Sequence, residues 1–189
     1  TVSFGYTEGV DLKGGSLHAV NSFITENSYT NKLGGGALRL RSGVTGPPTV
    51  DLVYSTLANN ANEPLKGVGD TINCEGPATI NVRNSILGRK PGTGNAGVVC
   101  PEATISVSHS VVDGDFDQGG NTKLAAEDIV KYLKSVPLTG AYRVVPMYAA
   151  FFNTVAQWEL GDAHFDYDLE PRNATLGGPD YAGADVYVP

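Results

Sequence analysis

The chain has 189 residues, a formal net charge of −7 and a pI near 4.8, which argues against nucleic acid or an anionic membrane surface as its partner. Hydrophobic residues make up 41% of the chain and can supply the core of one domain, and no apolar run is long enough to span a bilayer. Charged residues are only 17%, and 24 Gly and 11 Pro indicate many turns.

A phrase of about ten residues recurs four times along the chain. The four copies are Leu17–Ile24, Val50–Leu57, Ile80–Leu87 and Ile105–Val112, aligned on Ser22, Ser55, Ser85 and Ser110. In every copy, apolar residues stand five and three residues before the serine and two residues after it. Apolar residues at alternate positions predict a strand that turns one face toward a core.

The residue before each serine interrupts this alternation, and it is Asn21, Tyr54, Asn84 or His109. Asn and His are enriched among the non-glycine residues that adopt the left-handed backbone region. We therefore predict that this column of residues is a bend between two short strands. The serine after the bend would point inward, where its hydroxyl can bond the backbone or the serine of the neighbouring copy.

The separations between the four serines are 33, 30 and 25 residues. A strand-rich repeat of about 20–50 residues without a helical period is typical of a parallel β-helix, with insertions of unequal length in its loops. We predict an all-β fold, a right-handed single-stranded parallel β-helix (a solenoid) of about four coils over residues 1–115. Residues 116–189 would form an irregular C-terminal cap with a short helix, packed on the last coil.

The beginning of the chain bears on what covers the first coil. The sequence begins at Thr1 with neither Met nor a signal peptide, so we expect a matured product or an excised piece of a longer protein. Residues 1–6 would then be the remnant of an earlier coil. Because an open first coil exposes its core and its strand edges, we expect upstream coils or another copy of the chain to cover it.

The two cysteines are placed to form a disulfide. Cys74 lies eleven residues before Ser85 and Cys100 lies ten before Ser110, so they occupy nearly the same angular position on consecutive coils. Neighbouring strands are about 4.8 Å apart, and the Cα atoms of a disulfide are typically about 4.4–6.8 Å apart. We predict a Cys74–Cys100 disulfide, with two buried free thiols as the alternative. A disulfide implies an oxidising compartment.

Three arginines on predicted strands are candidates for a ligand site. The segment 34–41 is expected to open the second coil, with Arg39 and Arg41 on one face and leucines on the other. Arg83 lies on the strand of the third phrase. These side chains would bind acidic sugars, and ordinary solvated surface is the alternative for each of them.

An acidic turn follows the fourth phrase. Asp113, Asp115 and Asp117 alternate there, as in the first half of a calcium loop, and alternating carboxylates supply the oxygens that Ca²⁺ prefers. The sixth position is Gln118 and the twelfth is Leu124, so the turn is not an EF-hand. The turn is a candidate Ca²⁺ site, with a polar turn that caps the last coil as the alternative. We expect no cofactor to be required.

Residues 124–133 have the apolar spacing of a short helix, and the tail beyond them is irregular and acidic. The acidic residues near the end of the tail are Asp166, Asp168, Glu170, Asp180 and Asp185. These side chains would bond turn amides or pair with Arg172. The alternative is a second ion site, or an acid/base pair of carboxylates for sugar chemistry.

The tail also carries four motifs in order. They are Gly140-Ala141-Tyr142-Arg143, Leu160-Gly161-Asp162, Asp166-Tyr167-Asp168-Leu169-Glu170-Pro171-Arg172 and Gly177-Gly178-Pro179-Asp180-Tyr181-Ala182-Gly183-Ala184-Asp185-Val186-Tyr187. This series resembles the close of bacterial right-handed β-helix proteins of the choice-of-anchor Q type, which have a pectin-lyase-like fold. Glu170 stands where Gly is usual in that family, and Asp185 stands where Glu is usual. The resemblance, to the C-terminal portion of such proteins, implies an extracytoplasmic location, secreted or at the cell surface, more than it implies an activity.

Two functions follow as hypotheses. The first is a non-catalytic bacterial surface module for adhesion, which binds a polysaccharide, another surface glycan or a protein along the ridged face of the solenoid. The second is a polysaccharide lyase or glycoside hydrolase, or the C-terminal fragment of one, since such enzymes occur on this fold. We find no nucleophile, phosphate or dinucleotide motif, so we favour binding. Arg, Lys and Asp converging in one groove would favour an enzyme instead.

Overall fold

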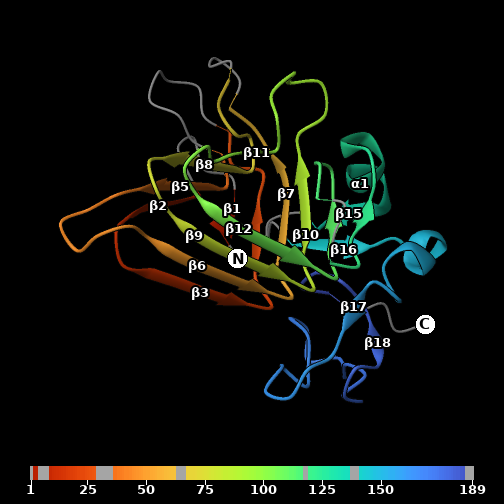
Figure 1. Cartoon of the computed structure of the whole chain (residues 1–189). Helices are drawn as coiled ribbons and strands as arrows, with labels where there is room; N and C mark the ends of the chain where they lie inside the picture. The colour runs from red at the N-terminus through yellow and green to blue at the C-terminus, as the bar shows by residue number, and fades with distance from the viewer. Residues whose placement is uncertain are drawn as a thin grey trace.

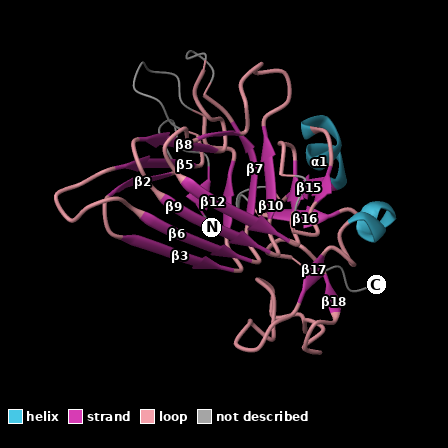
Figure 2. Ribbon diagram, viewed as in Figure 1, coloured by secondary structure: helices cyan, strands magenta, loops and turns pink. Residues whose placement is uncertain are grey.

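The structure is a computed structural model that describes residues 2–3, 9–28, 36–62, 67–116, 119–136 and 141–185. Strands dominate these residues, which also contain one α-helix, α1 (Ala126–Tyr132), and one 3-10 helix (Pro146–Phe151) (Figure 2). Most of the strands lie in three parallel sheets, here named A, B and C. This architecture is consistent with an all-β parallel solenoid.

Each parallel sheet collects strands that are far apart in the chain (Figure 1). Sheet A contains β1 (Val2–Ser3), β4 (Phe23–Thr25), β7 (Thr56–Asn60), β10 (Ile86–Arg89), β13 (Val111–Val112) and β14 (Thr122–Lys123). Sheet B contains β2 (Val10–Lys13), β5 (Leu38–Arg41), β8 (Ile72–Glu75) and β11 (Val98–Val99). Sheet C contains β3 (Ser16–Val20), β6 (Thr49–Val53), β9 (Thr79–Arg83) and β12 (Thr104–Ser108). The chain therefore passes through sheets B, C and A in turn, and we call each such pass a strand triplet.

The four serine-centred phrases lie side by side in register, as predicted. In sheet C, the residues five before each serine pair in the series Leu17, Val50, Ile80 and Ile105. In sheet A, the residues two after each serine pair in the series Ile24, Leu57, Leu87 and Val112. The repeated pattern of the sequence thus fixes which residues are neighbours across the strands.

The predicted bend between the two strands of each phrase is also confirmed. Asn21, Tyr54, Asn84 and His109 all have positive φ angles, of 47°, 48°, 56° and 48°. Each of them lies between a strand of sheet C and a strand of sheet A. A left-handed residue at this position turns the chain from one sheet into the next.

The serines after the bend form a buried ladder. The backbone N–H of Ser55 donates to Oγ of Ser85 (3.0 Å), and the N–H of Ser85 donates to Oγ of Ser110 (3.0 Å). The hydroxyl of Ser85 in turn donates to the carbonyl of Arg83 (2.8 Å). At the end of the ladder, Oδ1 of Asn121 accepts from the N–H of Ser110 (3.0 Å), so an asparagine takes the place of the next serine.

The predicted disulfide and the predicted short helix are both present. Cys74 and Cys100 form a disulfide, with their Cα atoms 4.6 Å apart. Cys74 lies in β8 of sheet B, and Cys100 follows β11, the neighbouring strand of the same sheet. The helix α1 spans Ala126–Tyr132, within the expected range 124–133, and it buries Ile129 completely.

Sheet A extends beyond the four phrases at both of its edges. The strand β1 pairs with β4, as expected if the first residues belong to an earlier turn of the chain, although residues 4–8 lie outside the described residues. At the other edge β14 pairs with β13, so the sheet continues past residue 115, where we expected the repeated part to end.

Apolar side chains form two cores, one on each face of sheet A. The first core brings together side chains from all three parallel sheets, such as Leu38, Leu52 and Leu57. The second core packs the other face of sheet A, including Phe23 and Ile86, against α1 and the chain that follows it. Gly88 makes this close approach possible, because a Cβ atom there would lie 2.7 Å from Cγ2 of Ile129.

We expected the C-terminal segment to be a cap that packs on the last coil. Instead, it lies along the flank of sheet A and contacts more than the last triplet. It contains two antiparallel pairs, β15 (Leu133–Ser135) with β16 (Tyr142–Val144), and β17 (Ala156–Gln157) with β18 (Pro179–Asp180). It reaches the bend residues of three triplets. Arg172 donates to Oδ1 of Asn21 (3.1 Å) and stacks 3.9 Å from the centroid of the Tyr54 ring, and Gln157 accepts from Nδ2 of Asn84 (2.8 Å).

Candidate functional site

Sheet C carries polar side chains on the face that turns away from the apolar core. Both faces of sheet A are covered by the two apolar cores. Sheet C instead carries exposed and half-buried side chains at the positions that alternate with its core residues. Among the described residues, these side chains are therefore available to a partner.

A row of polar side chains crosses the exposed face of sheet C. His18 lies opposite Asp51, Asp51 opposite Asn81, and Asn81 opposite Ser106. His18, Asn81 and Ser106 are exposed and Asp51 is half-buried. Nδ2 of Asn81 donates to Oδ1 of Asp51 (2.8 Å), which orients both side chains. The row thus presents groups that donate or accept hydrogen bonds at the spacing of adjacent strands, about 4.8 Å.

Two adjoining pockets follow this row toward the C-terminal segment. The first has a volume of about 360 Å³ and contains His18, Asp51, Asn81 and Arg83 among its lining residues. The second has a volume of about 170 Å³ and shares His18 and Arg83 with the first, and residues 160–163 form its far side. We define the groove on sheet C as these two pockets together.

Arg83 lies where the two pockets of the groove meet and makes a tight ion pair. Its Nη1 and Nη2 atoms donate to the two carboxylate oxygens of Asp162 (2.7 and 2.5 Å), and Glu159 lies 3.6 Å from Nε. Burial acts to raise the pKa of the Asp162 carboxyl, but the hydrogen bonds and charge of Arg83 together with the hydrogen bond from the Glu159 N–H leave that pKa below its ordinary value. The same hydrogen bonds raise the pKa of the Arg83 guanidinium. This arginine therefore stays charged and is held by two carboxylates.

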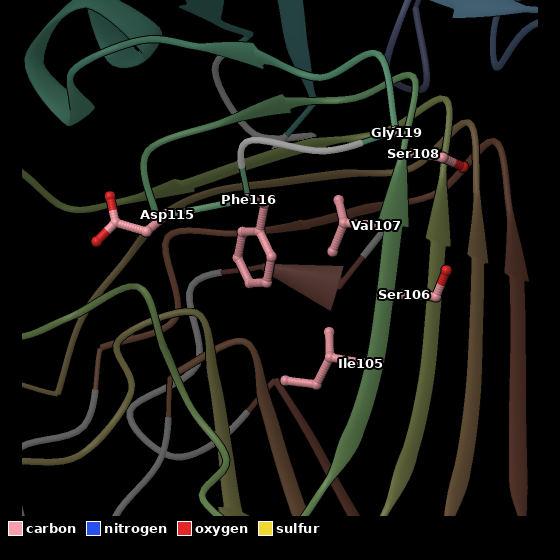
Figure 3. Close-up of a pocket in the computed structure, with 7 residues that line it drawn as sticks. All are labelled: Ile105, Ser106, Val107, Ser108, Asp115, Phe116 and Gly119. Carbon is pink, nitrogen blue, oxygen red and sulfur yellow. The ribbon is translucent and has the colours of Figure 1, made fainter.

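A larger hollow, of about 530 Å³, lies at the edge strand β12. Figure 3 shows Ile105, Val107 and Phe116 pointing toward one another, whereas Ser106 and Ser108 point to the other face of the strand. These apolar side chains continue the core between the sheets. The hollow therefore lies at the end of that core, and its polar lining side chains are Ser106, Ser108 and Asp115.

The two arginines predicted for sheet B pair with carboxylates of neighbouring strands. Nε of Arg39 donates to Oε1 of Glu75 (2.8 Å). Arg41 makes a bidentate pair with Asp11, in which its Nε donates to Oδ1 (3.0 Å). Their part in ligand binding stays a prediction, and the structure places them on a different sheet from Arg83.

The acidic turn after the fourth phrase is engaged by basic side chains and by the backbone. Oδ2 of Asp113 accepts from the N–H of Arg89 (2.7 Å), and burial raises the pKa of the Asp113 carboxyl. Asp115 pairs with Lys123. Asp117 lies outside the described residues. The proposed three-carboxylate set is therefore not tested, and a Ca²⁺ site in this turn stays a prediction.

The acidic residues of the tail separate into two groups. Asp180 lies 3.7 Å from Nη1 of the buried Arg172, the pairing that we predicted for the tail. Asp166, Glu170 and Asp185 come together elsewhere, where their carboxylates each place an oxygen within 4.8 Å of the others. This is the one group of three acidic, histidine or cysteine side chains in the described part of the chain whose geometry suits a metal ion.

Two parts of the site differ in how visible they are in the sequence. The residues of the polar row all stand four positions before a serine of the repeat, so the aligned phrases already contain them as a column. Asp162 and Glu159, by contrast, come from the irregular tail and meet Arg83 only through the docking of that tail. No local pattern indicates that contact.

The chain thus defines an all-β protein of stacked parallel sheets with an exposed polar face. Comparison with family models, with curated proteins and with solved structures finds no match in any of the three. In the described residues, no helix is both long and apolar enough to cross a membrane.

Proposed function

We propose that the chain is a module of a right-handed, single-stranded parallel β-helix with about four coils, and that its groove on sheet C binds a glycan without chemical change. The shape is supported by the constant register of four strand triplets, each of which adds one strand to every sheet. The right hand follows from the general preference of parallel crossovers. In this respect the proposal agrees with the resemblance to the choice-of-anchor Q type.

The row formed by His18, Asp51, Asn81 and Ser106 is the observation on which binding depends. Sugar hydroxyls both donate and accept hydrogen bonds, and side-chain amides, carboxylates, imidazoles and hydroxyls provide complementary partners. The row also runs across the strands in a straight line, so it can bind successive groups of an extended polymer. A rigid sheet holds these side chains in place, which lowers the entropic cost of binding.

Binding is favoured over catalysis by the pairing of the charged groups. Arg83, Asp51 and Asp162 do line the groove, which alone would favour an enzyme. Arg83 and Asp162 bind each other through both of their polar ends, however, and Asp51 accepts from Asn81. A lyase requires a base that can take a proton, and a guanidinium whose pKa is raised by an ion pair is a poor base.

An extracytoplasmic location is part of the same proposal. The Cys74–Cys100 disulfide supports it, because structural disulfides persist mainly in oxidising compartments. A surface-exposed, secreted module would use the groove for adhesion to a polysaccharide or another surface glycan.

A glycan-array screen of the purified chain, with and without Ca²⁺, tests the proposal. The double variant His18→Ala/Asn81→Ala removes exposed groups and should lower the affinity for the retained glycan at least about tenfold, the loss of one or two hydrogen bonds. Lys13→Ala, at an exposed position on sheet B, is the matched control and should leave the affinity unchanged. The proposal is wrong if no glycan is retained, or if the double variant binds as the wild type does. Release of new unsaturated products from an acidic polysaccharide would show a lyase instead.

A further inference from the structure

A cluster of carboxylates lies in the C-terminal segment, away from the groove on sheet C. Asp166, Glu170 and Asp185 each place a carboxylate oxygen within 4.8 Å of the other two. Oxygen ligands of Ca²⁺ lie about 2.3–2.6 Å from the ion, so two ligands of one ion are at most about 5 Å apart. The three oxygens are therefore close enough to contact a single cation.

A tight turn and a neighbouring segment hold the three side chains together. Oδ1 of Asp166 accepts from the backbone N–H of Asp168 (2.9 Å) and of Glu170 (2.8 Å), and the N–H of Asp166 donates to the carbonyl of Glu170 (2.9 Å). The N–H of Tyr167 donates to the carbonyl of Ala184 (3.0 Å). This bond brings Asp185, which follows Ala184 in the chain, beside the turn. The cluster thus joins residues 166–170 to the end of the described chain.

Asp185 provides a second and independent indication of a ligand. Its side chain is buried, with 4% of the residue exposed, and Oδ2 accepts from the N–H of Val144 (3.2 Å). Its Oδ1 atom is buried without any hydrogen-bond partner among the described residues. A buried carboxylate oxygen without a donor is costly, and a bound cation removes that cost.

Two arginines lie near these carboxylates. Arg143 lies 3.6 Å from Oδ1 of Asp185, but it makes its closer ion pair with Asp168 and is itself largely exposed. Arg143 lies beside the carboxylates of Asp168, Glu170 and Asp185, and the buried Arg172 also interacts with those of Asp166 and Asp185. Burial is the main cause that raises the pKa of the Asp185 carboxyl to about 7, with a smaller contribution from Asp166 and Asp168, and the Val144 N–H and Arg143 act to lower it.

We propose that Asp166, Glu170 and Asp185 form a binding site for a divalent cation of the calcium type. The ligands are all carboxylate oxygens, which suit hard cations such as Ca²⁺ better than zinc or copper. Glu170 is half-buried, so water has access to complete a coordination shell of six to eight oxygens. The ion would connect the turn at 166–170 with Asp185, and so fix the C-terminal segment. This site is separate from the acidic turn at residues 113–117 and does not depend on the proposed glycan binding.

Calorimetric titration of the chelator-treated full chain with CaCl₂, together with thermal melts, tests this site. We expect one binding site per chain, and at a free Ca²⁺ concentration of 100 times Kd a rise in Tm of roughly 5–10 °C. Glu170→Gln keeps the size of the side chain at the most accessible of the three positions, and it should weaken binding by at least about tenfold and lower the shift in Tm.

Asp115→Asn is the matched control, because it removes a carboxylate from the other acidic turn. It should leave both the affinity and the shift in Tm unchanged. The site is refuted if the wild-type chain neither binds Ca²⁺ nor gains stability from it, if Glu170→Gln binds as tightly as the wild type, or if the binding is lost in Asp115→Asn. Since the readouts are heat and Tm, a failure here leaves the glycan proposal untouched.

Discussion

Reduction of the Cys74–Cys100 disulfide should lower the stability of the chain by an amount that its loop length predicts. The bridge closes a loop with a sequence separation of 26 residues. In the chain-entropy treatment, opening a loop of that size restores to the unfolded chain an entropy that destabilises the fold by about 3.5 kcal/mol at room temperature. With a urea m-value of about 2 kcal/mol/M, the unfolding midpoint should fall by roughly 1.5–2 M.

Urea unfolding followed by the fluorescence of Trp158, the single tryptophan, measures this effect in the oxidised and the reduced chain. Comparing the same sequence in two redox states leaves the side-chain volumes in the core unchanged, which substitution would not. The Cys74→Ala/Cys100→Ala variant is the control, since its midpoint should not respond to the reductant. A shift of less than about 0.5 M in the wild type, with both thiols shown to be free, would refute the reasoning.

Three further changes test the second core and the serine ladder. Ile129→Ala should lower the free energy of unfolding by about 2–5 kcal/mol, because the side chain is fully buried against sheet A. Ser85→Ala should cost about 1–3 kcal/mol, since it leaves the buried N–H of Ser55 without an acceptor. Burial raises the pKa of both Tyr54 and Tyr142 in the fold, so stability should fall as the pH rises through the ordinary tyrosine pKa of about 10, where only the unfolded chain loses these protons.

Each of these outcomes has its own measurement and control. Urea midpoints report the stability of the two core and ladder variants. Glu127→Ala, on the exposed side of α1, is the control for Ile129→Ala. Ser22→Ala, at the serine of the first phrase, is the control for Ser85→Ala. Equal losses in variant and control would argue against the assigned packing. For the third, tyrosinate absorbance reports the ionisation of the tyrosines, and stability is compared between pH 9 and 11. If Tyr54→Phe/Tyr142→Phe lost as much stability between pH 9 and 11 as the wild type, the two hydroxyls would not be its source.

The repeated part of the fold follows from the sequence because the sequence repeats. Aligning four phrases on their serines predicts the register of Leu17, Val50, Ile80 and Ile105, and it predicts the left-handed bend at the preceding column. Once that register is known, the Cys74–Cys100 disulfide can be predicted from the positions of the two cysteines in the repeat. Period and side-chain chemistry are both local properties, so they are readable without coordinates.

The position of the C-terminal segment could not be predicted in the same way. Arg172 meets Asn21 across 151 positions of sequence, and neither residue belongs to a pattern that marks the other as its partner. The expectation of a cap on the last coil came from irregular composition alone, which says that a segment packs somewhere but not on which face. The polar row of sheet C lies between these cases, since its column is visible in the repeat but its exposure depends on where the tail lies.

The anchoring of the tail at Asn21, Tyr54 and Asn84 has a consequence for how the molecule comes apart. In an ordinary repeat array each unit touches only its neighbours, and unfolding can start at one end and advance stepwise. Here Arg172 contacts the first two triplets and Gln157 contacts the third, so none of these three triplets can detach without releasing the tail as well. Hydrogen exchange should therefore give the amides of β4 and β10 nearly the same opening free energy, as expected for one cooperative unit.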